Sequence, residues 1–264
     1  MTHRIAVDAD SVAGPLPWPE SGAVTVWRFA IDVLSPQAQR CLHWLSEAET
    51  DRLLGYIKSG ARTTFLVSRC ALRWTLSRYL QVSPDKIALT EGAHGKPKCA
   101  CNHLRFNLSH SGTCLLIAVS GGEVGVDVEM RRTHLNTEAL CGYLAPEEAE
   151  VILATPAGER RDVLLRRCWS RKEALAKAIG LGLSLPLSRY SVPLDSLRDA
   201  AIVNVTGHGR WWLHALPVQD GGEAALASDN PLTDIRLIAG HFAAPGMGRD
   251  SSTPIRAQGS SDSA

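Results

Sequence analysis

The sequence predicts an α+β fold built from two pseudo-symmetric α/β lobes, and two observations support this prediction. From residue 23 to 120 the expected order of elements is β-α-α-β-β-β, and the same order returns from 123 to about 217, followed by one more strand. A glycine pair, Gly121-Gly122, forms a turn between the two halves. No residue-level identity relates the halves, so only the architecture repeats. We expect a ligand cleft where the two lobes meet.

The first lobe is expected over residues 23–120, after an extended N-terminal lead-in over 1–22 that is rich in proline and glycine. Residues 23–32 alternate in polarity and predict a strand, and Ser46 begins a helix with an acidic first turn. A longer helix is expected over about 61–80, with four arginines on its water-exposed side: Arg62, Arg69, Arg73 and Arg78. Short strands follow at 86–89, 105–108 and 114–120.

The second lobe is expected over residues 121–244. It begins with a strand at 124–129 and continues with helices around 137–143, 146–153 and 159–179. Gly180 and Gly182 end the last helix, because glycine adopts positive φ at little cost. Strands at 190–192, 201–206, 211–216 and 235–242 complete the lobe. The tail over 245–264 has almost nothing to bury, and we expect it to be disordered.

Composition narrows the class of protein. The 264 residues carry 28 basic and 27 acidic side chains, and this balance argues against a protein that binds nucleic acid by bulk charge. The longest apolar run, Cys114 to Val119, falls far short of the ~20 residues that span a bilayer. Asp8 and Asp10 interrupt the N-terminus, which lacks the apolar stretch of a signal peptide. We therefore expect a soluble, cytoplasmic protein.

The seven cysteines do not predict a disulfide framework or a zinc ribbon. Their number is odd, and the close pair Cys99 and Cys101 has C-x-C spacing rather than C-x-x-C. Three histidines flank the pair, His94, His103 and His110, so a metal site there is an alternative to ordinary reduced thiols. Ordinary thiols are the favoured interpretation.

An acidic strand is the first candidate for chemistry. In Gly125-Val-Asp-Val-Glu129, the side chains of Asp127 and Glu129 share one face of the strand. Two such carboxylates repel each other, and a divalent cation with oxygen ligands, such as Mg²⁺, would offset this repulsion. The alternative is a strand end with two solvated acids, paired to Arg131 or Arg132.

A charged pair on the long second-lobe helix is the next candidate. Glu173 and Lys177 are four residues apart and lie on one helix face. An exposed pair of this kind contributes only a few tenths of a kcal/mol. However, Trp169 and Leu175 are among the apolar neighbours of the pair, and two of the six lysines of the chain lie in this stretch. This placement favours a functional role.

A third candidate combines the Gly95-Lys96-Pro97 segment with the strand end Ser109-His110-Ser111-Gly112. Hydroxyl, imidazole and backbone N–H donors at a turn suit phosphate oxygens. A hydrolase pair of Ser109 and His110 is disfavoured, because adjacent strand residues point to opposite faces and no G-x-S-x-G motif is present. Taken alone, His110 would be a turn histidine with a satisfied hydrogen bond.

The order of these motifs resembles that of a known family. GKP, FNLSHSG, GVDVE and WSRKEALAKAIGLGL, followed by LSLPLSRYSV, are together similar to the 4'-phosphopantetheinyl transferases, in particular the surfactin-synthetase-activating (Sfp) type. The resemblance covers roughly residues 45–195. It implies two pseudo-symmetric lobes with coenzyme A in the cleft between them. It also implies Mg²⁺-dependent transfer of the 4'-phosphopantetheine arm of coenzyme A to a serine of an acyl or peptidyl carrier protein domain, with release of adenosine 3',5'-bisphosphate.

The resemblance also implies roles for single residues. Asp127, Glu129 and Glu173 would hold Mg²⁺ against the diphosphate, and Lys177 would stabilise the developing charge. Asp127, Glu173 and Lys177 are thus the expected catalytic residues. Coenzyme A would be bound by a set of basic and polar side chains: Lys96, Ser109, His110 and Lys177 for the phosphates, and Arg52 and Arg62 near the 3'-phosphate and adenine. Either Glu173 or a water on the metal could accept the proton of the attacking serine.

Partners follow from the same resemblance. Carrier domains are typically acidic, so we expect docking near the basic pairs Arg131-Arg132 or Arg160-Arg161, although an ordinary solvated helix face would look the same. Because one chain supplies both lobes, we expect a monomer. The carrier and its pathway (fatty acid, polyketide or non-ribosomal peptide synthesis) stay open. The alternatives to an enzyme are a non-catalytic coenzyme A- or nucleotide-binding protein of the same fold, or a plain interaction protein.

Overall fold

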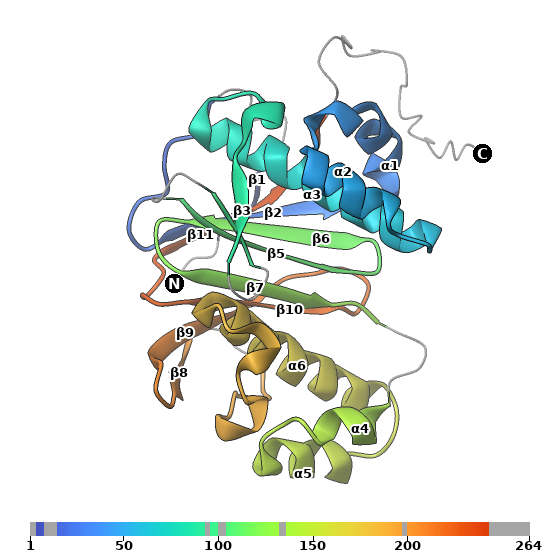
Figure 1. The fold of residues 1–264 in the computed structure, drawn as a ribbon. Coiled ribbons are helices and arrows are strands. Elements are labelled where there is room, and N and C mark those ends of the chain that lie inside the picture. The colour runs from blue at the N-terminus through green and yellow to red at the C-terminus, as the bar shows by residue number, and fades with distance from the viewer. Residues whose placement is uncertain are drawn as a thin grey trace, which may run out of the picture.

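The computed structural model of the chain describes residues 4–7, 15–92, 96–99, 104–131, 136–196 and 200–242. Their elements stack in four layers, with helices outside and two sheets inside (Figure 1). This mixed α/β architecture confirms the predicted fold class. Several predictions lie outside the described residues: the disordered tail, much of the lead-in, and the metal alternative at Cys101, His94 and His103.

The first sheet has five strands. Their order is β1 (Arg4–Val7), β11 (Asp234–Ala239), β2 (Ala23–Ala30), β6 (Cys114–Ser120) and β5 (Arg105–Ser111). Its outer face is covered by α1 (Ile31–Arg40), α2 (Glu47–Leu54) and α3 (Ser59–Leu80) (Figure 1). A separate two-stranded ribbon joins β3 (Leu89–Glu91) to β4 (Pro97–Cys99).

The second sheet has four strands, in the order β7 (Val124–Glu129), β10 (Glu223–Ser228), β9 (Gly209–Leu216) and β8 (Ala201–Val205). On its outer face lie α4 (Thr137–Cys141), α5 (Pro146–Ala154) and α6 (Glu159–Ile179) (Figure 1). Short 3₁₀ helices occur at Leu42–Trp44, Pro84–Lys86, Gly182–Ser184 and Leu187–Arg189.

The two halves share one topology. In each, the first strand pairs antiparallel with the last strand of the unit, and that strand pairs with its predecessor: β2–β6–β5 and β7–β10–β9. Each unit also contains one long helix, α3 or α6, packed on its sheet. The last strand, β11, returns to the first sheet. It follows the second unit in the chain but pairs in parallel with β2.

Several predictions about elements were wrong, including the strand predicted at 86–89, where the structure has the 3₁₀ helix Pro84–Lys86 and β3 begins only at Leu89. Residues 31–40 form a helix where we predicted the end of a strand and no further element, because the usual start signals are missing: Pro36 lies inside α1 and Ala30 provides no side-chain cap. The central strand β10 was missed, since its alanine-rich sequence has weak β propensity. The predicted strand at 190–192 is not paired; its Val192 N–H instead donates to Glu148 Oε1 at 2.7 Å.

Arg73 also departs from expectation, because it is buried rather than exposed to water. Its side chain is 2% exposed, and Nε and Nη2 lie 2.8 and 2.7 Å from Oε2 of Glu49. Its Nη1 donates to the backbone carbonyls of Pro84 and Ile87. Around Arg73, the helix face that looked polar in sequence is therefore covered by α2 and the segment after α3, and the guanidinium joins these elements.

The inner faces of the two sheets pack directly on each other. Val24, Val26 and Leu116 of the first sheet meet Val126 and Leu226 of the second in one buried apolar cluster. On the outer side of β7, helix α6 approaches so closely that a Cβ on Gly125 would lie 2.1 Å from the carbonyl oxygen of Ala174. Glycine at this position lets α6 lie against β7, which brings the polar side chains of the two elements together.

Candidate active site

Strands β5 and β7 belong to different sheets, yet side chains of β5 bond to the backbone of β7 and of the residue that follows it. The N–H of Val126 donates to Asn107 Oδ1 at 2.8 Å, and the N–H of Met130 donates to Ser111 Oγ at 3.0 Å. Asn107 and Ser111 are buried and lie on the same face of β5, four residues apart. This polar face fixes the position of β7 relative to the first lobe.

Asp127 lies at the centre of the site, between these two bonds. Its side chain is buried, and Oδ1 accepts hydrogen bonds from Ser109 Oγ at 2.7 Å and from Lys177 Nζ at 2.6 Å. Lys177 Nζ also donates to Ser109 Oγ at 2.9 Å. The other carboxylate oxygen, Oδ2, is buried and has no hydrogen-bond partner among the described residues. Both lobes therefore contribute to one cluster of Ser109, Asp127 and Lys177.

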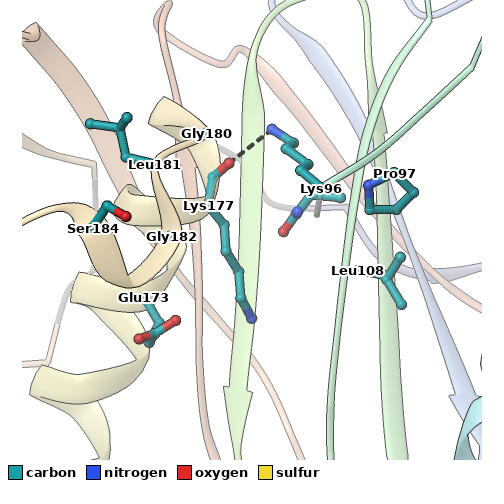
Figure 2. Close-up of a pocket in the computed structure, with 10 residues that line it drawn as sticks. Lys96, Pro97, Leu108, Glu173, Lys177, Gly180, Leu181, Gly182 and Ser184 are labelled. Carbon is teal, nitrogen blue, oxygen red and sulfur yellow. Dashed lines mark hydrogen bonds between the residues drawn. The ribbon is translucent and has the colours of Figure 1, made fainter. Parts of the chain in front are cut away.

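A cavity of about 580 Å³ opens beside this cluster. Its walls come from both lobes: Lys96, Pro97, Asn107 and Leu108 on one side, and Glu173, Lys177, Gly180, Leu181, Gly182 and Ser184 on the other (Figure 2). Glu173 and Lys177, one turn apart on α6, both line the cavity. The cavity is therefore lined by residues from both halves of the chain.

Glu173 is a carboxylate in a partly apolar environment. Burial raises its pKa, the ammonium of Lys177 opposes this rise, and the charge of Asp127 adds to it. A carboxylate with a raised pKa is a stronger base than an ordinary glutamate, which suits proton abstraction near neutral pH.

The fit of a metal ion was tested on the same residues. Asp127, Glu129 and Glu173 offer the hard oxygen ligands that Mg²⁺ prefers, and the partnerless Asp127 Oδ2 is a free ligand position within the described chain. However, the described residues contain no group of three or more acidic, histidine or cysteine side chains gathered closely enough to hold a metal. The ligand types thus suit Mg²⁺, and the ammonium of Lys177 lies 2.6 Å from Asp127 Oδ1.

Lys96 has a different environment from the one we predicted. Its Nζ donates to the backbone carbonyls of Lys177 at 2.8 Å and Val124 at 3.1 Å, and lies 3.7 Å from a carboxylate oxygen of Glu123 (Figure 2). Burial lowers its pKa, against the opposing effect of Glu123. In this structure Lys96 ties the end of α6 to the start of β7.

A second cavity of about 450 Å³ shares Lys96 with the first. It is also lined by Lys98, Arg105 and Phe106 and by one carboxylate, that of Glu123. Three cationic side chains against one carboxylate suit an anionic ligand.

The remaining predicted residues lie further from the cluster. His110 follows Ser109 near the end of β5; desolvation and then the nearby charge of Lys177 lower its pKa, and the charge of Asp127 opposes this. Arg52 and Arg62 are exposed on α2 and α3, the Arg52 guanidinium lies 5.4 Å from the centre of the Phe65 ring, and neither arginine lines the two cavities. The structure does not bring these two arginines to the Asp127 cluster.

The sequence analysis included Asn107 and Ser111 in a candidate segment but gave neither residue a role of its own. Both belong to the FNLSHSG segment, where polar residues occupy every second position and therefore share one face of the strand. That alternation was a usable signal. Its meaning, a polar face bonded to the backbone of another lobe, depends on tertiary packing.

The arginines proposed to contact a carrier domain differ in exposure and in the contacts that they already make. Arg131 is largely exposed and pairs with Glu159 at 2.9 Å, and Arg132 lies outside the described residues. Arg160 is exposed at the start of α6. Arg161 instead donates to the carbonyls of Thr155 and Leu153, and so stabilises the C-terminal end of α5. Across the described parts of the chain, no helix combines the length and hydrophobicity that crossing a membrane requires.

Comparison with known proteins gives consistent matches. A family model described as the 4'-phosphopantetheinyl transferase superfamily matches residues 123–228, and one described as the N-terminal part of 4'-phosphopantetheinyl transferase matches 33–121. A putative 4'-phosphopantetheinyl transferase of Synechocystis sp. is 33% identical over 64% of this chain and 70% of its own length. HetI of Nostoc sp. is 30% identical (78% and 88% covered), and Sfp of Bacillus subtilis 27% (71% and 88%).

Proposed function

The chain belongs to the 4'-phosphopantetheinyl transferase superfamily, and from this premise we propose the reaction of its active site. The enzyme transfers the 4'-phosphopantetheine arm of coenzyme A to a serine of an acyl or peptidyl carrier domain and releases adenosine 3',5'-bisphosphate. One observation carries this proposal: Ser109, Asp127 and Lys177 meet beside Glu173 at the wall of a cavity that both lobes line.

Coenzyme A binds across the two cavities that share Lys96. The diphosphate lies beside Lys177 and Ser109, whose ammonium and hydroxyl groups are suited to phosphate oxygens. His110, at the end of the same strand, adds a further donor. The cationic second cavity takes the adenosine 3'-phosphate end, next to Lys98 and Arg105. Contacts of Arg52 and Arg62 with that end stay a prediction, which requires coenzyme A to extend beyond the two cavities.

The transfer is a displacement at phosphorus. The serine oxygen of the carrier forms a bond to the phosphorus that bears the pantetheine arm, and the bond from that phosphorus to the bridging oxygen breaks. Glu173, at the cavity wall, accepts the serine proton, and Lys177 stabilises the charge that develops on the leaving adenosine 3',5'-bisphosphate. Phosphoryl-type transfer needs positioning and charge neutralisation more than covalent participation of the protein.

Three carboxylates of this chain would hold Mg²⁺, namely Asp127, Glu129 and Glu173. When bound, the ion supplies Lewis-acid stabilisation of charge on the diphosphate. The buried oxygen Asp127 Oδ2, which lacks a partner within the described residues, supports this assignment. Ser109 holds the Asp127 carboxylate in position through Oδ1.

The carrier domain approaches the mouth of the cavity from the side of α6 and the segment after β7. Arg160 and Arg131 are exposed there and suit an acidic surface. Because one chain supplies both walls of the cavity, we propose that the enzyme is a monomer, with its lobes at residues 23–120 and 121–244.

The proposal is tested by intact-protein mass spectrometry of an apo-carrier incubated with coenzyme A, Mg²⁺ and enzyme. We expect the carrier to gain the mass of one phosphopantetheine arm with the wild-type enzyme, and Asp127→Ala and Glu173→Ala to abolish the gain. Asp32→Ala, which removes an exposed acid on α1, is the matched control and should leave the rate unchanged. Undiminished transfer by the first two variants would refute the site assignment. Coenzyme A binding without transfer to any of a panel of carriers would favour the non-catalytic alternative.

A further inference from the structure

One carboxylate lines the otherwise cationic second cavity. Glu123 shares the walls of this cavity with Lys96, Lys98 and Arg105, and it is the only acidic side chain among the described residues that line it. Its Oε1 lies 3.0 Å from Arg105 Nε, and its Oε2 lies 3.7 Å from Lys96 Nζ. A single carboxylate therefore pairs with two of the three cations at once.

The charges around this cavity act on one another. The ammonium of Lys96 has three N–H donors, and two of its contacts are the backbone carbonyls described above, so Glu123 pairs with an ammonium whose donors are largely used. Burial lowers the pKa of Lys96, Glu123 opposes this, and the charges of Lys98 and Arg105 add to it. The four side chains thus form one coupled group of three positive charges and one negative charge.

Glu123 meets a ligand from a fixed backbone position. Its carbonyl accepts the N–H of Asp229 at 3.2 Å, and β7 begins at the next residue. The side chains of Glu123 and Arg105 are 41% and 42% exposed, so both are accessible from the cavity. An anion that contacts any N–H group of Arg105 therefore comes close to the negative charge of Glu123, and this repulsion does not require the two to share one atom.

We propose that Glu123 sets the charge selectivity of the second cavity, because it weakens the binding of a phosphate dianion relative to an uncharged hydroxyl at the same place. Specificity is a difference between two affinities, and a like charge lowers one of them. This inference rests on the proposed function, which places the 3'-phosphate end of coenzyme A in this cavity. Glu123 is then a specificity-determining residue that keeps the affinity for the released adenosine 3',5'-bisphosphate below the affinity that the three cations alone would give.

The test compares two ligands that differ only in the 3'-phosphate, adenosine 3',5'-bisphosphate and adenosine 5'-phosphate. Isothermal titration calorimetry with the full-length enzyme, at pH 8 and low salt, gives the ratio of their affinities, in which the shared parts cancel. The 3'-phosphate is doubly charged at this pH. We expect Glu123→Gln to raise the ratio in favour of the bisphosphate roughly threefold to tenfold, since one repelling charge is removed. The gain should shrink as salt is added.

Two variants control for shape and for net charge. Glu123→Asp keeps the carboxylate, so its ratio should stay within about twofold of wild type. Glu150→Gln removes an exposed acid on α5 that lines neither cavity, and it should leave the ratio unchanged. The Gln side chain matches Glu in size at a half-exposed position, so the fold of the variant should be preserved.

An unchanged ratio in Glu123→Gln would overturn the proposal. A lower ratio would also overturn it, and would mean that Glu123 orients Arg105 for the phosphate. A gain that salt does not reduce would show that charge is not the cause, with the same consequence. Failure of the wild-type enzyme to bind adenosine 3',5'-bisphosphate at all would instead refute the assignment of this cavity in the proposed function, and this inference with it.

Discussion

The ammonium of Lys177 lies 2.6 Å from Oδ1 of Asp127, and the two residues come from a helix and a strand that only a glycine allows to pack together. The hydroxyl of Ser109, from the other lobe, bonds to both. The site therefore depends on three close approaches: α6 on β7, β5 on β7, and Lys96 on the end of α6. The first and third can be tested by single substitutions.

Gly125→Ala should destabilise the protein strongly, because the new Cβ would lie 2.1 Å from Ala174 O and 2.3 Å from Ala178 N. Relief requires α6 to shift away from β7, and overpacking of this kind costs about 1–3 kcal/mol or more. Urea unfolding of the metal-free protein measures the loss. Gly60→Ala, an exposed position of α3 with no atom within 4 Å of the added Cβ, is the control and should be neutral or stabilising. Equal stability of the Gly125 and Gly60 variants would contradict the packing described here.

Lys96→Met should lower stability even when no ligand is present. The ammonium bonds to the carbonyls of Lys177 and Val124, and leaving such partners unsatisfied costs about 1–3 kcal/mol. Thermal unfolding of the coenzyme A-free protein checks this. The neighbouring exposed Lys98→Met should change stability by no more than about 0.5 kcal/mol. If Lys96 serves only as a phosphate ligand, its removal will leave the free protein as stable as wild type.

The residue before Glu173 anchors α6 through a fully buried ion pair. Lys172 Nζ lies 2.8 Å from Glu148 Oε2, donates to the carbonyls of Leu187 and Tyr190, and lies 4.5 Å from the centre of the Tyr190 ring. Lys172→Met leaves Glu148 buried without its counter-ion and should cost about 3–5 kcal/mol in denaturant unfolding. The double variant with Glu148→Gln should recover part of this loss, because the uncompensated charge is gone. A double variant no more stable than Lys172→Met would argue against charge as the cause.

Glu173→Gln should stabilise the metal-free protein at neutral pH. Burial raises the pKa of Glu173, so the folded protein binds this proton more readily than the unfolded chain. The ionised carboxylate therefore lowers stability at pH 7, and the loss shrinks as pH falls below the folded-state pKa and vanishes below the pKa of the unfolded chain. Melting temperatures in the presence of a chelator should favour the variant at pH 7 and converge below about pH 4, where both side chains are neutral. A variant less stable than wild type at pH 7 would show that Lys177 outweighs burial.

The local features of the fold could be predicted from sequence. The periodic apolar residues and Gly180 placed α6 at 159–179, the bounds that the structure shows, and alternation placed Asp127 on β7. Features that depend on contacts between distant residues could not be predicted. Lys96 and Lys177 are 81 residues apart, and nothing in the GKP segment indicates that its lysine bonds to a helix carbonyl. The predicted exposure of Arg73 was wrong for the same reason. A helix arginine that other elements cover has the same local sequence as an exposed one.

We propose above all that transfer of the coenzyme A arm takes place at the Asp127 cluster with metal assistance. It is tested most directly by measuring, in one reaction, the adenosine 3',5'-bisphosphate released and the mass gained by an apo-carrier, for wild type and Asp127→Asn. We predict one adenosine 3',5'-bisphosphate per modified carrier with wild type, loss of both products on addition of a chelator, and recovery of both with excess Mg²⁺. Asp127→Asn should form neither product at any Mg²⁺ concentration. Wild-type rates from Asp127→Asn, or transfer that a chelator does not affect, would contradict the account.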